Sequence, residues 1–210
     1  MTGSERVMVV MAGPSLDIEQ FIDRLVAQGE RVALIGAQVD SAALSISGDD
    51  ALEPTVALQR VEQELGPVAS LVCVTAVPPP APFVGGEIDH WSATVGDALT
   101  QPFQMIRASL PNLRRNHSGR IVLIGAGWLL SGRPGRTAAA AVHGGLVALV
   151  KTLGRELGRD GISVNEVVFD ADHPPPVAVI ADTVGYLCGP YAAGVVGQLV
   201  TVGSPGEARP

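Results

Sequence analysis

Two sets of side chains in the sequence could carry out acid–base chemistry. His143 lies within a run of small residues, whereas Asp170, Asp172 and His173 follow a β-rich apolar run. An imidazole can act as a general base near neutral pH, and carboxylates can share such proton transfers. The Asp-x-Asp-His spacing could also ligate a metal ion, but it is not specific, and we predict no metal site. In the simpler interpretation, His143 is a helix histidine with satisfied hydrogen bonds and the segment 170–173 is a solvated turn.

The elements that would position these groups alternate along the chain as short apolar runs and longer amphipathic segments. This alternation is typical of a parallel sheet flanked by helices. Strands are expected at Val7–Met11, Arg31–Gly36, Ala43–Ser47, Leu71–Ala76, Ile121–Gly125, Ile162–Phe169 and Gly197–Val202. Helices are expected at Asp17–Gln28, Glu53–Leu65, His90–Arg115 and Arg136–Leu157, and Pro174–Pro176 is expected to start a short connection. We therefore expect one domain over residues 1–202 and a flexible tail over 203–210.

Composition narrows the class of protein further. The formal net charge is −7, and Lys151 is the only lysine, so the chain has no basic stripe for nucleic acid or an anionic membrane. The first residues lack a basic region followed by an apolar core, so we expect no signal peptide and a cytoplasmic protein. Cys73 and Cys188 lie in apolar runs and are expected to be buried thiols rather than a disulfide.

Several motifs resemble the short-chain dehydrogenase/reductase family in their order and spacing. They are Gly119–Ala126, Gly132–Gly135, Gly145–Leu149, Leu153–Leu157, Gly161–Asn165 and Gly197–Val202. The resemblance implies an α/β, Rossmann-like doubly wound fold with a seven-stranded, mainly parallel sheet, helices on both faces and a shortened substrate lid. It also implies a dimer or tetramer, assembled through residues 90–115, residues 136–157 and the last strand.

The same resemblance assigns the family's catalytic positions to four residues of this chain. The asparagine position falls at Ala98, the serine position at Ala126, the tyrosine position at Ala139 and the lysine position at His143. An alanine side chain can neither donate nor accept a proton. Hydride transfer by the family's usual mechanism is therefore not expected, and only His143 retains a titratable group.

The family's cofactor turn corresponds to Met11–Ile18. A glycine-rich turn lets a pyrophosphate approach backbone N–H groups at a helix N-terminus. Here only Gly13 is left, Pro14 lacks an N–H group, and the carboxylate of Asp17 would repel a phosphate. We therefore expect no cofactor; NAD or NADP would bind only if the resemblance outweighs these changes.

These observations lead to a main functional prediction and two alternatives. The main prediction is a pseudoenzyme of this family, acting as a structural or regulatory subunit in a homo-oligomer or in a hetero-oligomer with an active relative. The first alternative is a non-redox cyclase, dehydratase or isomerase in a biosynthetic pathway, using His143 with Asp170, Asp172 and His173. The second is the NAD(P)-dependent ketoreductase that the family resemblance implies. In each case the small-molecule ligand is undetermined.

Overall fold

The structure is a computed structural model, and it describes residues 6–47, 53–115, 118–127 and 132–203. The strands are β1 (Val7–Met11), β2 (Arg31–Ile35), β3 (Leu44–Ile46), β4 (Val68–Val74), β5 (Arg120–Gly127), β6 (Ser163–Asp170) and β7 (Leu199–Thr201). The α-helices are α1 (Ile18–Ala27), α2 (Pro54–Leu65), α3 (Ile88–Arg115), α4 (Thr137–Leu157) and α5 (Val177–Cys188). Two short 3-10 helices are η3 (Gly158–Asp160) and η4 (Pro190–Ala192).

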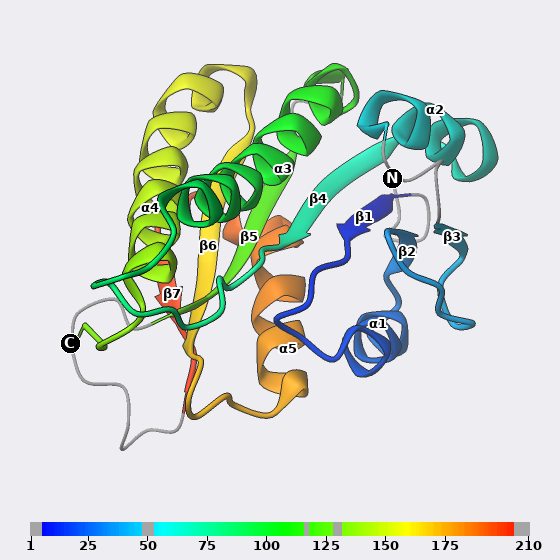
Figure 1. The fold of residues 1–210 in the computed structure, drawn as a ribbon. Coiled ribbons are helices and arrows are strands. Elements are labelled where there is room, and N and C mark those ends of the chain that lie inside the picture. Colours follow the sequence, from blue (N-terminus) through cyan, green and yellow to red (C-terminus); the bar gives the residue numbers. More distant parts are fainter. Residues whose placement is uncertain (1–5, 48–52, 116–117, 128–131, 204–210) are drawn as a thin grey trace.

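The seven strands form one sheet in the order β3-β2-β1-β4-β5-β6-β7, and every pair is parallel (Figure 1). This confirms the doubly wound α/β fold predicted from the sequence. The strand order reverses between β1 and β4, which pair with each other. In open parallel sheets, ligands bind in the crevice beyond the carboxyl ends of the strands at such a reversal.

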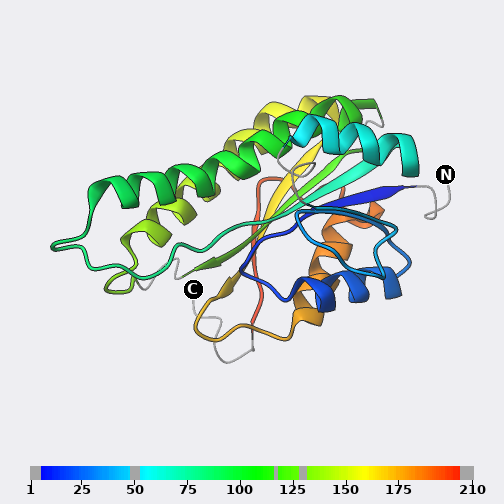
Figure 2. The ribbon, with the colours of Figure 1, turned by 45° about the vertical axis from the view of Figure 1, so that its right-hand side comes forward.

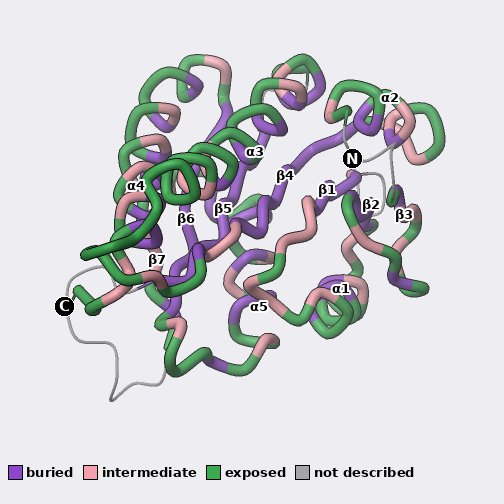
Figure 3. Tube along the Cα trace, in the orientation of Figure 1, coloured by how far each residue is buried: buried purple, intermediate pink, exposed green. Residues whose placement is uncertain are grey.

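Helices cover both faces of the sheet (Figure 2). The face under α2, α3 and α4 buries one apolar cluster, which includes Leu71, Leu123 and Leu146. The face under α1 and α5 buries a second cluster, which includes Phe21, Ile124 and Val184. The strands are buried almost throughout, whereas the amino-terminal half of α3 is largely exposed (Figure 3).

Two segments differ from the sequence prediction. The fourth strand starts earlier, at Val68, because the apolar run already begins there. The segment after Pro174–Pro176 forms the helix α5, which the sequence analysis missed. Prolines are common at helix starts, and α5 buries Ile180, Val184 and Leu187 on the sheet. The tail predicted at 203–210 lies, from residue 204 on, outside the described residues.

One helical segment of the described chain, Thr137–Asp160, is long and apolar enough to cross a membrane by composition alone. The core helix of a globular protein passes the same test. In the structure this segment comprises α4 and η3, and α4 packs on β5, β6 and α3. Part of its apolar surface is therefore buried within the fold.

Candidate active site

A histidine and a glutamate meet where α4 packs on β5 and β6. His143 on α4 is 6% exposed, and Glu166 on β6 is fully buried. The Nε2 atom of His143 lies 3.4 Å from the Oε1 atom of Glu166. The nitrogens of this imidazole and the oxygens of this carboxyl have no hydrogen-bond partner among the described residues. The structure therefore brings His143 together with a carboxyl group that the sequence analysis did not identify.

Two glycines on β5 provide the space for this pair. Gly125 and Gly127 are two residues apart and therefore face the same side of the sheet. A Cβ atom on Gly125 would lie 2.6 Å from Oε1 of Glu166, and one on Gly127 would lie 2.4 Å from Nδ1 of His143. Any larger residue at these positions would displace one member of the pair.

Burial changes the proton affinity of both groups in opposite directions. It raises the pKa of the Glu166 carboxyl to about 7, because the charged carboxylate is poorly solvated there. It lowers the pKa of the His143 imidazole from its ordinary value for the same reason. Burial therefore favours the neutral form of each group, and this neutral pair differs from an ion pair only in the position of one proton.

The second predicted group, Asp170 to His173, lies beyond the end of β6. Asp170 is in register with Gly127, and its Oδ2 atom lies 3.8 Å from Nδ1 of His173. The Oδ2 atom of Asp172 forms an ion pair with the guanidinium of Arg133 at 3.1 Å. These side chains are substantially exposed, which fits the interpretation of a solvated turn. Within the described ranges, no group of three or more His, Cys, Asp or Glu residues could hold a metal ion.

The three alanines assigned to catalytic positions are buried near the same end of the sheet. Ala98 lies on α3, Ala126 on β5 and Ala139 on α4, one helical turn before His143. The hydroxyl of Thr75, which follows β4, donates to the carbonyl of Ile124 at 2.8 Å. Among the residues named at this site, the titratable groups that are buried are His143 and Glu166.

The turn between β1 and α1 is packed against the end of β4. A Cβ atom on Gly13 would lie 2.0 Å from the carbonyl oxygen of Val74, and the Ser15 hydroxyl donates to the carbonyl of Thr75. The Asp17 carboxylate caps α1 by accepting from the backbone N–H of Gln20. With Pro14 lacking an N–H group, these residues do not fit a pyrophosphate in the way that a glycine-rich turn does.

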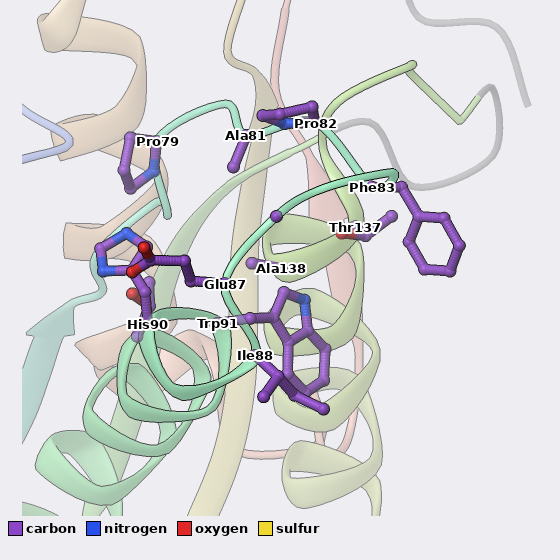
Figure 4. Close-up of a pocket in the computed structure, with 12 residues that line it drawn as sticks. Pro79, Ala81, Pro82, Phe83, Glu87, Ile88, His90, Trp91, Thr137 and Ala138 are labelled. Carbon is purple, nitrogen blue, oxygen red and sulfur yellow. The ribbon is translucent and has the colours of Figure 1, made fainter.

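A cavity of about 390 Å³ lies between the segment before α3, the start of α3 and the start of α4 (Figure 4). Pro79, Pro82, Phe83, Ile88 and Trp91 give it largely apolar walls. Glu87 and His90 lie together at one edge of the cavity, away from Phe83 (Figure 4). The cavity reaches α4 at Thr137 and Ala138, directly before Ala139.

His143 borders a smaller pocket, which the first turns of α4 also line. This pocket has a volume of about 110 Å³, and its lining includes Arg133, Arg136, Ala139 and His143. Arg133 and Arg136 line this pocket together with His143, and the guanidinium of Arg133 is paired with Asp172. The first turns of α4 thus contribute to both the apolar cavity and this smaller pocket.

The parallel doubly wound sheet, with a crevice beyond its strand ends, defines a class of α/β proteins that bind ligands at this place. Within this class, the sequence profile described as short chain dehydrogenase matches residues 9–171. The chain therefore belongs to the short chain dehydrogenase family.

Known proteins agree with this assignment. The chain is 26% identical over 133 residues to a 3-oxoacyl-acyl-carrier-protein reductase, FabG, of Vibrio harveyi, covering 63% of this chain and 54% of that protein. The chain thus spans about half the length of that curated relative. The structure of the TT0495 protein from Thermus thermophilus is 25% identical with a TM-score of 0.81, covering 94% of this chain and 97% of the other. A short chain oxidoreductase from Pseudomonas aeruginosa PAO1, described as containing an atypical catalytic center, shares the fold with a TM-score of 0.83 at 18% identity and 99% coverage of both chains.

These findings correct two predictions. The prediction of a pseudoenzyme subunit is contradicted, because the family is one of dehydrogenases and the curated relative is named as a reductase. The prediction that no cofactor binds is contradicted by the same family membership, which makes a nicotinamide cofactor the expectation. The first error gave too much weight to the missing side chains at Ala126 and Ala139, and the second gave too much weight to the changed turn at Met11–Ile18.

Proposed function

We propose that the chain is an oxidoreductase that interconverts a carbonyl and an alcohol on a small, largely apolar substrate, with NADH or NADPH as the hydride carrier. The observation that carries this proposal is the family match over residues 9–171, which begins within β1 and includes β4, β5, α4 and β6. When bound, a nicotinamide cofactor would supply or accept the hydride, although the β1–α1 turn with Pro14 and Asp17 offers its pyrophosphate fewer backbone N–H donors than a glycine-rich turn does. The chain's own residues would bind and orient the substrate and hold or move the proton.

We further propose that this is a diverged member of the family, with an altered proton-transfer group. Ala98, Ala126 and Ala139 carry no exchangeable proton, so the tyrosine-based mechanism needs a replacement. His143 is the best candidate for the replacement proton-transfer group. An imidazole is titratable near neutral pH, and that of His143 lines the same pocket as Ala139. The existence of a family fold with an atypical catalytic center in Pseudomonas aeruginosa supports such a replacement by analogy only.

The substrate class follows from the cavity between α3 and α4. Its walls of proline, phenylalanine, isoleucine and tryptophan favour an apolar chain or ring, and a cavity of about 390 Å³ falls within the usual size for small ligands. Thr94 and Thr137 provide hydroxyl groups that can orient one polar atom. The Vibrio harveyi relative is named for a 3-oxoacyl substrate, so acyl thioesters with a 3-oxo group are the first compounds to test.

The test is a calorimetric titration with NADH and NADPH, followed by an assay for loss of reduced cofactor with 3-oxoacyl thioesters and simple apolar ketones. Saturable binding of one cofactor and substrate-dependent oxidation are expected. Trp91→Glu, which places a charge in the apolar wall, should raise KM more than it lowers kcat. Absence of both binding and oxidation would contradict the proposal, and turnover without any nicotinamide would point to a cofactor-free acid–base reaction instead.

We also propose that the protein is cytoplasmic and forms a homo-oligomer through α3 and α4. The observation that supports self-association is Phe103 on α3, an aromatic side chain that is 47% exposed and does not line the cavity. Exposed aromatic residues are enriched at interfaces between subunits. A second copy of this chain would bury this side chain against its counterpart.

A further inference from the structure

The feature that carries a further inference is the contact between His143 and Glu166. Both side chains are more than nine-tenths buried, their nearest polar atoms are 3.4 Å apart, and neither has another hydrogen-bond partner among the described residues. Leaving polar atoms buried without partners is costly, and so is burying a lone charge. A single proton shared between Nε2 of His143 and Oε1 of Glu166 lowers both costs, because it gives these two atoms a partner and makes the pair neutral.

We infer that His143 and Glu166 form one buried proton-sharing pair, in which Glu166 is the positioning residue and His143 faces the pocket bordered by Arg133 and Arg136. The pair holds one proton in addition to the one fixed on the imidazole ring. That proton lies either on the carboxyl, which donates to Nε2, or on Nε2, which donates to the carboxylate. Both forms have zero net charge, which is what the buried site requires.

The surroundings of the pair support this assignment. Strand β5 contributes Gly125 and Gly127, whose lack of a side chain leaves room for the carboxyl and the imidazole. The register partner of Glu166 on β7 is Leu199, which has no charge. Among the described residues that line the pocket with His143, the charged ones are Arg133 and Arg136. Arg133 is paired with Asp172, and Asp170 is exposed at the end of β6.

The proton count of the pair can be measured without any knowledge of the reaction. The ordinary pKa values of the two groups are 4.5 for the glutamate and 6.5 for the histidine. Between these two pH values, the histidine of the unfolded chain is protonated and the glutamate is ionised. The unfolded chain thus holds the same number of protons on these groups as the folded pair. A folded pair with one proton then neither takes up nor releases a proton on unfolding. The pair therefore adds no pH dependence to the stability of the wild-type protein in this range.

Single replacements should reveal opposite dependences. In Glu166→Gln, the remaining imidazole is neutral when folded and charged when unfolded, so the free energy of unfolding rises with pH. In His143→Gln, the remaining carboxyl is protonated when folded and ionised when unfolded, so the free energy of unfolding falls as the pH rises. In each variant, unfolding takes up or releases up to about one proton. The unfolding constant therefore changes by up to about tenfold per pH unit.

The experiment is urea denaturation of the wild type and both variants across this pH range. Ser163→Ala is a matched control, because it removes a buried but non-titratable hydroxyl on the same strand. The free energy of unfolding is plotted against pH for each protein. A slope above that of the wild type in Glu166→Gln and below it in His143→Gln supports the pair. A wild-type slope equal to that of Glu166→Gln would overturn it, since the folded pair would then hold no shared proton.

A second measurement applies if a variant does not fold. In the wild type labelled with carbon-13 at the glutamate carboxyl, a buried carboxyl resonance is expected to titrate near pH 7. Titration of every glutamate carboxyl near 4.5 would contradict the pair. Both results are independent of catalysis.

The role of the pair in turnover rests on the proposed oxidoreductase function. There, Glu166→Gln should lower kcat and shift the pH profile of kcat with little change in KM, and Glu166→Asp should restore part of the activity. A stable pair in a protein without nicotinamide-dependent turnover would refute the proposed function alone. An unchanged pH profile in an active Glu166→Gln variant would refute the positioning role alone.

Discussion

The backbone of Gly127 lies directly under the imidazole of His143: a Cβ atom there would be 2.4 Å from Nδ1. Gly125 lies under Glu166 in the same way, because a Cβ atom on Gly125 would be 2.6 Å from Oε1 of Glu166. Strand β5 therefore has glycine at both positions where a side chain would collide with the buried pair. Because β-strands gain little from glycine, this choice is best explained by the space that the pair needs.

Replacing either glycine tests that relation. Gly127→Ala should lower the free energy of unfolding by about 1–3 kcal/mol, because the added methyl group must displace the ring in a closely packed site. The measurement is urea denaturation. Gly96→Ala is the control, since nothing lies within 4 Å of a Cβ atom on this exposed residue of α3. That variant should gain about 0.5–1 kcal/mol from its helix. A neutral Gly127→Ala would mean that the pair can lie elsewhere.

The two cysteines give a readout of local opening. Cys73 and Cys188 are free thiols and buried, as the sequence analysis predicted. Burial raises the pKa of both thiols, for Cys188 to about 12, so almost no thiolate is present at neutral pH. We expect no reaction with an aromatic disulfide reagent in the native state and complete reaction in denaturant. Rapid labelling of the native protein would show that β4 or the end of α5 opens readily.

Self-association should depend on the exposed apolar residues of α3. Phe103→Glu introduces a charge at a side chain that is 47% exposed, and we expect it to convert the homo-oligomer to a monomer with an unchanged circular dichroism spectrum. Light scattering coupled to gel filtration measures the mass. Tyr191→Glu is the matched control, because this aromatic residue is 91% exposed and lies outside α3, in η4. A monomeric wild type would contradict the assembly.

The fold could be predicted from the sequence because hydrophobic periodicity and order determine it. The apolar runs around Val7 and Ile121 are long enough to define buried strands, and their alternation with helices allows few topologies. Helix α5 was missed because its apolar residues follow a run of prolines, which was interpreted as a loop. The signal was present, since proline is common in the first turn of a helix.

The site was harder to predict because its pairing depends on contacts between distant segments. His143 was identified, but its partner was sought at Asp170 to His173. The signal for Glu166 was a single carboxylate within the apolar strand Val164–Phe169, together with glycines on the neighbouring strand. A charge in a buried strand requires a partner, but only the packing of α4 on β6 shows which residue that is.

Cofactor binding should respond to the charge at the start of α1. The Asp17 carboxylate caps the helix by accepting from the N–H of Gln20, and it occupies the end of the helix that attracts anions. Asp17→Asn keeps a capping oxygen but removes the negative charge, so it should preserve stability and tighten NADH or NADPH binding by about two- to tenfold. Calorimetric titration measures the affinity. The control is Asp97→Asn, which removes the same charge from α3, on the other face of the sheet, and should leave the affinity unchanged. Equal affinity in wild type and Asp17→Asn, with binding observed in both, would mean that the pyrophosphate does not lie at this turn.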